Sequence, residues 1–114
     1  MKKIKVLLGL ALLACSAAAL AEDKCTSWGC ISTVSTLYTN ADGAIYVGTP
    51  LDESLANCTS VSGAFFTLNP TAGNAKEMYA SVLAAHMSNK KIMLRVKEGH
   101  PTCELAYVTL DTSY

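Results

Sequence analysis

Four cysteines constrain the possible folds of this chain more than any other feature of its sequence. Cys25, Cys30, Cys58 and Cys103 all follow a segment, residues 1–21, that has the features of a secretory signal peptide. An even number of cysteines in a short exported domain is typical of two disulfide bonds. Because their spacings match neither redox nor zinc-binding patterns, we expect disulfides, and neither a metal site nor a cofactor.

The N-terminal segment predicts export from the cytoplasm. Three of the first five residues are lysines, residues 6–14 are apolar, and residues 19–21 read Ala-Leu-Ala, which is a cleavage signal. We therefore expect a signal peptide over residues 1–21, cleaved near Ala21, and a periplasmic or secreted protein. The apolar stretch is too short to remain across a bilayer, so we expect no membrane span.

A lipid anchor is the alternative interpretation of the same segment. Residues 12–15 approximate the bacterial lipobox, in which Cys15 would be lipidated and become the first residue of a membrane-anchored protein. Leu13 fits that motif poorly, and the apolar residues 16–21 stand where a lipoprotein usually has a polar tether. These two features favour cleavage near Ala21 over lipidation at Cys15.

The chain after the cleavage site is long enough for one small domain. Residues 22–114 are 93 of the 114 residues, and removal of three lysines leaves six basic against nine acidic side chains. Nucleic acid binding needs a basic surplus that this segment lacks, so we expect no nucleic acid partner. We predict a single exported domain over residues 22–114.

Four cysteines allow three pairings, and the sequence alone does not choose between them. We favour Cys25–Cys30, which closes a local loop, and Cys58–Cys103, which joins distant parts of the chain. Loop-closure entropy gives the first bond about 2 kcal/mol of stabilisation and the second about 4 kcal/mol. Because a small domain buries little surface, we expect the long-range bond to matter most for folding.

The first half of the predicted domain reads as three strands. Residues 31–39 are rich in β-branched side chains, and apolar residues at every third position predict a long strand with a bulge or a strong bend. The turn residues 40–43 connect it to a second strand over 44–48, and the two should form a hairpin. A loop with one helical turn at 52–56 leads to a third strand over 63–68.

A helix and two further strands follow. Asn74 and Glu77 fit a capping box, and apolar residues recur at helical spacing over 75–86. Residues 90–97 alternate between apolar and polar, and residues 104–110 read as the last strand. This order predicts a mainly β, disulfide-bonded fold, namely a five-stranded OB-like Greek-key barrel with one α-helix between strands three and four.

The same topology places the third and fifth strands side by side and parallel, which would bring Cys58 and Cys103 together. The element order over residues 30–110 resembles the B subunits of AB-type bacterial toxins and a group of small secreted bacterial OB-fold proteins. The helix that runs into a basic-edged strand over 76–96 carries most of this resemblance. It implies an exported OB-fold that assembles as a ring and binds host glycans, although no sugar-binding residue transfers by position.

Neither histidine is a candidate catalytic residue. His86 lies on the apolar stripe of the predicted helix, where we expect a packed, hydrogen-bonded side chain. His100 precedes Pro101 in a loop, where we expect a solvated turn residue. Motifs of hydrolases, metalloproteases and nucleotide-binding enzymes do not occur in the sequence, and disulfides account for the cysteines of the predicted domain. We therefore expect a protein that is not an enzyme.

Trp28 and Tyr46 are the candidate ligand-binding residues. Trp28, the only tryptophan, lies in the short loop between Cys25 and Cys30, where a ring is hard to bury and can stack on a sugar or a partner. The alternative is that this ring folds back over the open end of the barrel. Tyr46 would complete a recognition patch with Trp28, and its alternative is ordinary strand surface.

These observations predict a secreted or periplasmic, non-catalytic binding module that recognises a glycan or a protein partner. The alternative is a periplasmic structural or inhibitor-like protein, and a small hydrolase is a third possibility. One face of the predicted helix carries only small residues, Ala80, Ala84 and Ser88. That face would allow either close contact between copies of the chain in a homo-oligomer or packing on the chain's own strands.

Overall fold

The computed structural model of the chain describes residues 22–114. The predicted signal peptide, its cleavage site at Ala21 and Cys15 lie outside the described residues. Within residues 22–114, no helix is both long enough and apolar enough to cross a membrane.

Seven short strands, one α-helix and one 3₁₀ turn make up the described chain. In order they are β1 (Lys24–Thr26), β2 (Gly29–Ser32), β3 (Thr36–Thr39), β4 (Ile45–Gly48), η1 (Glu53–Leu55), β5 (Phe66–Thr67), α1 (Ala75–Ser88), β6 (Ile92–Val96) and β7 (Leu105–Thr109). The helical turn predicted between the second and third strands is therefore confirmed by η1.

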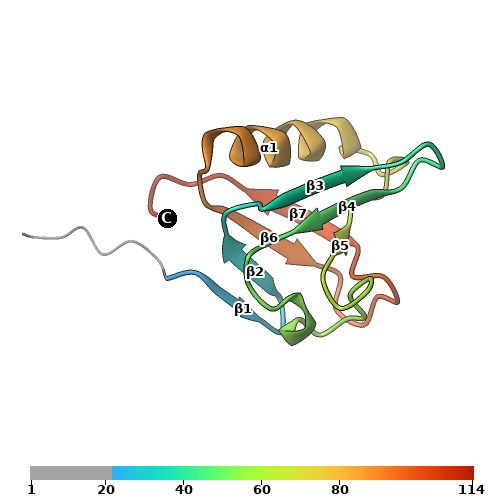
Figure 1. Cartoon of the computed structure of the whole chain (residues 1–114), viewed down its shortest axis with the longest axis horizontal. Coiled ribbons are helices and arrows are strands. Elements are labelled where there is room, and N and C mark those ends of the chain that lie inside the picture. Colours follow the sequence, from blue (N-terminus) through green and yellow to red (C-terminus); the bar gives the residue numbers. More distant parts are fainter. Residues whose placement is uncertain (1–21) are drawn as a thin grey trace, which may run out of the picture.

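The strands form two antiparallel sheets (Figure 1). One sheet has the order β1-β2-β6-β7, and the other has the order β3-β4-β5. The helix α1 packs against β3 of one sheet and β7 of the other. The chain is mainly β with one α-helix and two disulfides, as predicted, but the prediction of a closed barrel with five strands is wrong.

The first predicted strand, residues 31–39, is divided between the two sheets. β2 ends at Ser32, β3 begins at Thr36, and the chain bends between them. Side chains of a regular strand alternate between two faces, so apolar residues at every third position cannot all reach one core without a bend. Val34 lies at the bend, is buried in the core, and its carbonyl oxygen accepts a hydrogen bond of 2.8 Å from Nδ1 of His86. The predicted bend and the predicted packed, hydrogen-bonded His86 are both confirmed.

The Cys25–Cys30 loop is itself a β-hairpin, which adds a strand that the sequence analysis did not predict. β1 pairs with β2, with Cys25 opposite Cys30 and Thr26 opposite Gly29. Cys25 and Cys30 are joined by a disulfide, which confirms the favoured pairing. Because β1 has only three residues, its apolar pattern is too short to be read from the sequence.

The predicted hairpin of the second sheet is confirmed. β3 pairs with β4, with Tyr38 opposite Tyr46, and β4 also pairs with β5. The third predicted strand, residues 63–68, is reduced to the two residues of β5. The reason is that Ser62 and Gly63 have positive φ angles of 54° and 67° and turn the chain.

The two sheets meet at a parallel bridge between Thr67 of β5 and Glu104, which precedes β7. The Thr67 N–H donates a hydrogen bond of 3.1 Å to the carbonyl oxygen of Cys103. Cys103 is also joined to Cys58 by the second disulfide. The predicted parallel proximity of the third and fifth strands is therefore confirmed at this bridge, and so is the favoured Cys58–Cys103 pairing.

The helix and its predicted start after Asn74 are confirmed, but the predicted capping box is wrong. Asn74 has φ −112° and ψ 33°, and its side chain makes no capping hydrogen bond, so the capping box with Glu77 does not form. A residue that caps a helix N-terminus through its side chain is usually extended. The helix ends at Ser88 and is capped by Asn89, a left-handed residue whose N–H donates to the carbonyl oxygens of Ala85 and His86.

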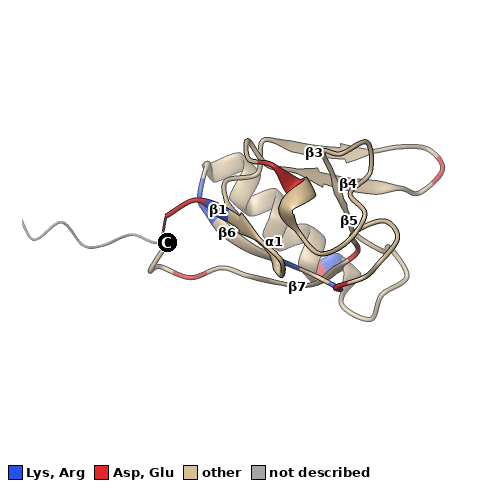
Figure 2. Ribbon diagram, turned by 90° about the horizontal axis from the view of Figure 1, so that it is seen from below, with Lys and Arg blue, Asp and Glu red and all other residues tan. Residues whose placement is uncertain are grey.

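One buried cluster contains side chains from both sheets and from α1. Its largest members are Val47, Phe66, Leu68, Val82, Ile92, Leu94 and Leu105. Figure 2 shows the basic and acidic residues at scattered positions along the ribbon, not gathered on one element.

The two disulfides should differ in their contribution to stability. Cys58–Cys103 spans 45 residues and Cys25–Cys30 spans 5. We expect the double substitution Cys58→Ala/Cys103→Ala to lower the free energy of unfolding by about 4 kcal/mol, and Cys25→Ala/Cys30→Ala to lower it by about 2 kcal/mol. Urea denaturation of the oxidised proteins measures both values. Equal losses of unfolding free energy in the two double variants would contradict the larger contribution of Cys58–Cys103.

Candidate functional site

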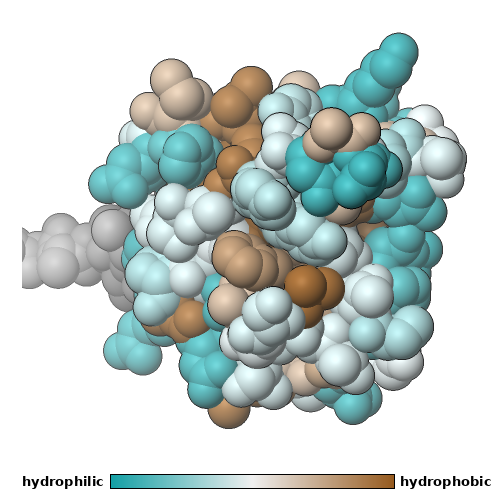
Figure 3. Space-filling model, turned by 45° about the vertical axis from the view of Figure 1, so that its right-hand side comes forward, coloured by the Kyte–Doolittle hydropathy of each residue, from teal (hydrophilic) through white to brown (hydrophobic). Residues whose placement is uncertain are grey.

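A hollow of about 300 Å³ opens on the surface where the two sheets meet. We call it the junction hollow; its lining residues are Ala44, Ile45, Tyr46, Val61, Thr67, Leu68, Asn69, Pro70, Thr102 and Glu104. It contains Tyr46, one of the two predicted ligand-binding residues. Apolar and polar residues are mixed on the face of the molecule shown in Figure 3, and no continuous apolar surface covers it.

A larger open hollow, of about 560 Å³, lies beside Glu53. The Glu53 side chain is buried, and its Oε1 accepts hydrogen bonds from the backbone N–H of Thr49 at 2.6 Å and from the Thr49 hydroxyl at 2.8 Å. These bonds tie the start of η1 to the end of β4. Glu53 therefore has a clear structural role, and we place the candidate site at the junction hollow.

Tyr46 is the aromatic residue that lines the junction hollow, and its ring contacts two further rings. Tyr38 and Tyr46 face each other across β3 and β4, with their ring centroids 5.4 Å apart and their planes 12° apart. Phe65 lies on the other side of Tyr46, with a centroid distance of 5.9 Å. Tyr46 is therefore held in one orientation, and rings that are already fixed lose little entropy when a ligand binds.

Hydroxyl groups of two threonines also line the hollow. Thr67 lies opposite Tyr46 in the register of β4 and β5. Its Oγ1 donates a hydrogen bond of 3.0 Å to the carbonyl oxygen of Thr102 and lies 3.3 Å from Oγ1 of Thr102. Because each hydroxyl offers one donor and two acceptor positions, both threonines keep capacity for a further hydrogen bond.

Glu104 supplies the carboxylate of the hollow. Its side chain is only 11% exposed, and its Oε2 accepts a charged hydrogen bond from Nζ of Lys97. The bond from Lys97 lowers the pKa of the Glu104 carboxyl below its usual value, although burial raises it. The charge of Lys97, a hydrogen bond from the Asn69 side chain and the charge of His100 lower this pKa further.

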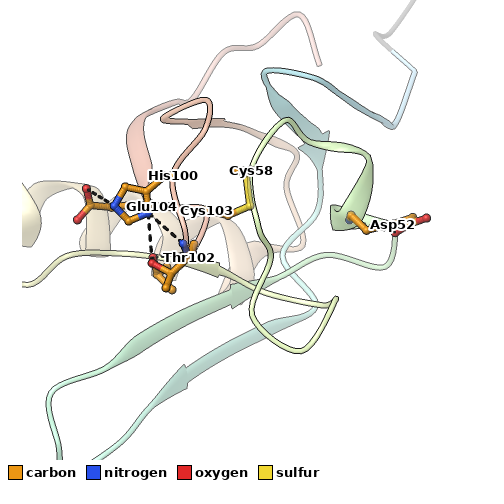
Figure 4. Close-up of a disulfide and its surroundings, with 8 residues drawn as sticks. Asp52, Cys58, His100, Thr102, Cys103 and Glu104 are labelled. Atoms are coloured by element: carbon orange, nitrogen blue, oxygen red, sulfur yellow. Dashed lines mark hydrogen bonds and ion pairs between the residues drawn. A yellow bond between two sulfur atoms is a disulfide. The ribbon is translucent and has the colours of Figure 1, made fainter.

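His100 is more firmly held than the predicted solvated turn residue. Its Nδ1 accepts hydrogen bonds from the backbone N–H groups of Thr102 at 3.1 Å and Glu104 at 3.3 Å. Its Nε2 lies 3.7 Å from Oε2 of Glu104. Figure 4 shows His100, Thr102 and Glu104 together on one side of the Cys58–Cys103 disulfide.

Trp28, the other predicted ligand-binding residue, lies outside the junction hollow. It is half-buried in the turn between β1 and β2 of the first sheet, and its ring contacts Arg95. Tyr46 belongs to the second sheet and contacts Tyr38 and Phe65. The two predicted residues thus belong to different aromatic groups. The structure therefore places them at two separate surface features.

The small-residue face of α1 is open to solvent. Ala80, Ala84 and Ser88 are all exposed. This excludes the prediction that the face packs on the chain's own strands. Leu83 and Met87 of the same helix are also exposed, at 38% and 77%.

Comparisons with protein families, curated proteins and solved structures find no match to this chain. The described residues also contain no group of three or more His, Cys, Asp or Glu side chains placed to hold a metal ion.

The sequence analysis found Tyr46 but missed the polar half of the hollow, which Thr67, Asn69, Thr102 and Glu104 form. One signal in the sequence could have located these polar residues. The predicted parallel neighbours were the third and fifth strands, and placing them side by side puts Thr67 next to residues 102–104. The spacing of His100 and Glu104 was a second signal, because four residues across a turn can bring two side chains together.

The ionised state of Glu104 should make stability depend on pH. Because the folded-state pKa lies below the ordinary value of 4.5, Glu104 stabilises the fold above that pH, and this stability is lost as the pH falls through the folded-state pKa. We expect the free energy of unfolding of the wild type to exceed that of Glu104→Gln at about pH 6, and the difference to shrink at about pH 3.

Thermal or urea unfolding at both pH values measures this difference. Glu98→Gln, which removes an exposed carboxylate from the same loop, is the matched control and should leave the pH dependence of the wild type in place. If the free energies of unfolding of wild type and Glu104→Gln differed by the same amount at both pH values, the lowered pKa of Glu104 would be contradicted.

Proposed function

We propose that this chain is an exported, non-catalytic binding module that recognises a neutral glycan at the junction hollow. Its export is supported by the signal sequence over residues 1–21 and by two disulfides, which are typical of oxidising compartments. The order of strand neighbours, with α1 between β5 and β6, supports an OB-like arrangement that is open where the two sheets separate.

One observation carries the proposal: an aromatic ring and hydroxyl, amide and carboxylate groups line one shallow hollow. Sugars have apolar C–H faces that pack on aromatic rings and hydroxyl groups that exchange hydrogen bonds with polar side chains. Tyr46 supplies the ring, and Thr67, Asn69, Thr102 and Glu104 supply the polar groups. Sites that bind small ligands commonly combine apolar walls with a few convergent polar groups.

The acidic groups of the hollow support binding over hydrolysis. Cleavage of a glycosidic bond generally uses two carboxyl groups about 5–9.5 Å apart, one of which must be protonated. Among the residues that line the hollow, Glu104 is the one acidic side chain. Its lowered pKa keeps it ionised at neutral pH, so it accepts hydrogen bonds and does not act as a proton donor.

The second candidate is a periplasmic structural or inhibitor-like protein that binds a protein partner. It is favoured by the exposed apolar side chains of α1, Leu83 and Met87, which border the small-residue face. Exposed apolar patches often mark protein interfaces. A glycan remains the better-supported ligand because the junction hollow combines an aromatic ring with several polar groups, whereas the exposed face of α1 offers mainly apolar side chains.

A glycan array probed with the mature, oxidised protein tests the proposal. We expect capture of one or a few related neutral glycans. Tyr46→Ala should weaken that capture by about tenfold or more, because it removes the ring on which the sugar packs. Tyr107→Ala is the control, since it removes a tyrosine that lies outside the junction hollow on the other sheet and should leave capture unchanged.

Two outcomes would contradict the proposal. One is an array on which no neutral glycan is captured by the folded protein. The other is a captured glycan that Tyr46→Ala binds as well as the wild type does. Retention of a named protein partner that Leu83→Ala/Met87→Ala no longer binds would instead support the second candidate.

A further inference from the structure

Arg95 lies between two aromatic rings on the outer face of the first sheet. Its guanidinium carbon, Cζ, is 5.8 Å from the centre of the Trp28 ring and 6.0 Å from the centre of the Tyr107 ring. Arg95 is opposite Gly29 of β2 and opposite Tyr107 of β7 in the sheet register. The three side chains therefore come from adjacent positions on one sheet, and we call them the arginine–aromatic site.

The guanidinium of Arg95 has no acidic partner among residues 22–114. The ion pairs of the described chain involve Lys91, Lys97 and His100, and no carboxylate lies within 4.0 Å of Arg95. The neighbouring rings interact with a guanidinium through its charge and its flat faces. Its five N–H groups lie in the plane of the guanidinium and point outward from its edge, so they remain able to donate.

The backbone around Trp28 is held rigidly. The turn is closed by the Cys25–Cys30 disulfide, and the Trp28 carbonyl oxygen accepts a hydrogen bond of 2.9 Å from the Val96 N–H. Gly29 has φ +137°, and a Cβ there would lie 1.9 Å from the carbonyl oxygen of Leu94, so only glycine fits. The site is therefore formed before any ligand arrives, which lowers the entropic cost of binding.

We propose that the arginine–aromatic site is a second binding site, which takes a sugar bearing a carboxylate group, that is, a uronic acid residue of a saccharide. The edge of a guanidinium pairs with a carboxylate through two parallel hydrogen bonds. Trp28 and Tyr107 lie beside the guanidinium, and the parts of their rings that Arg95 does not cover would pack on the apolar face of the sugar ring. Tyr107 is 48% exposed, so at least this ring is open to a ligand.

The charge of the protein favours a ligand with few negative charges. Residues 22–114 carry six basic and nine acidic side chains, so a densely charged polyanion would be repelled overall. One guanidinium matches one carboxylate. Trp28, Arg95 and Tyr107 do not line the junction hollow, so this site is independent of the proposed neutral-glycan site.

Trp28 is the only tryptophan of the chain, so its fluorescence reports directly on this site. The experiment titrates the mature, oxidised protein with a galacturonic acid trimer and, separately, with the matched neutral galactose trimer. We expect a saturable change of Trp28 emission with the acidic trimer only, and weaker binding of that trimer at high salt, which screens the charge pair.

Variants separate this site from the junction hollow. Arg95→Gln should weaken binding of the acidic trimer by about tenfold or more, and Arg95→Lys should give an intermediate affinity because it keeps the charge but loses the planar edge. Tyr46→Ala should bind the acidic trimer as the wild type does. Thermal unfolding of each variant establishes that it is folded, and Tyr107→Ala, at an exposed position, serves as a second variant should Arg95→Gln fail to fold.

Several outcomes would overturn the inference. One is an equal change of Trp28 emission with the acidic and the neutral trimer. Another is an unchanged affinity of folded Arg95→Gln or Tyr107→Ala for the acidic trimer. A third is a change of Trp28 emission with a glutamate-rich peptide but not with the acidic trimer. Loss of acidic-trimer binding in Tyr46→Ala would assign the acidic sugar to the junction hollow and would also overturn it. None of these results bears on capture of neutral glycans, which tests the proposed function separately.

Discussion

The bond network around Cys103 is the constraint on which the rest of this structure depends. The two sheets are joined through the chain at the bend after β2, and at the opposite end through the bridge between Thr67 and Glu104. The Cys58–Cys103 disulfide and the hydrogen bond from Thr67 to Cys103 hold that bridge in place. Without this disulfide and this hydrogen bond, few contacts would fix the two sheets relative to each other at this end of a small domain with short strands.

The junction hollow is a direct consequence of this closure. Tyr46 and Thr67 come from one sheet, Thr102 and Glu104 come from the segment that leads into the other, and the hollow exists only where the two meet. The ion pair of Glu104 with Lys97 further fixes this segment, because Lys97 directly follows β6. The same contacts that close the fold therefore position the polar groups of the proposed site.

Local features of this fold could be predicted from the sequence, and features that depend on distant contacts largely could not. The helical spacing of α1, the hairpin of β3 and β4, the bend near Val34 and both disulfides follow from short-range patterns or from topology. The division into two sheets arises because β2 pairs with β1 and β6, whereas β3 pairs with β4. The local sequence pattern does not determine these partners. The polar half of the hollow was missed for the same reason, since Thr67 and Glu104 are far apart in the chain.

The central claim is that the sheet junction is where this protein recognises its ligand, and the amide chemical shifts of the ¹⁵N-labelled mature protein test it most directly. On titration with a neutral glycan captured from the array, the account predicts that the largest shifts fall on Tyr46, Thr67, Thr102 and Glu104, which surround the hollow. Largest shifts on α1, with the junction amides unchanged, would contradict it.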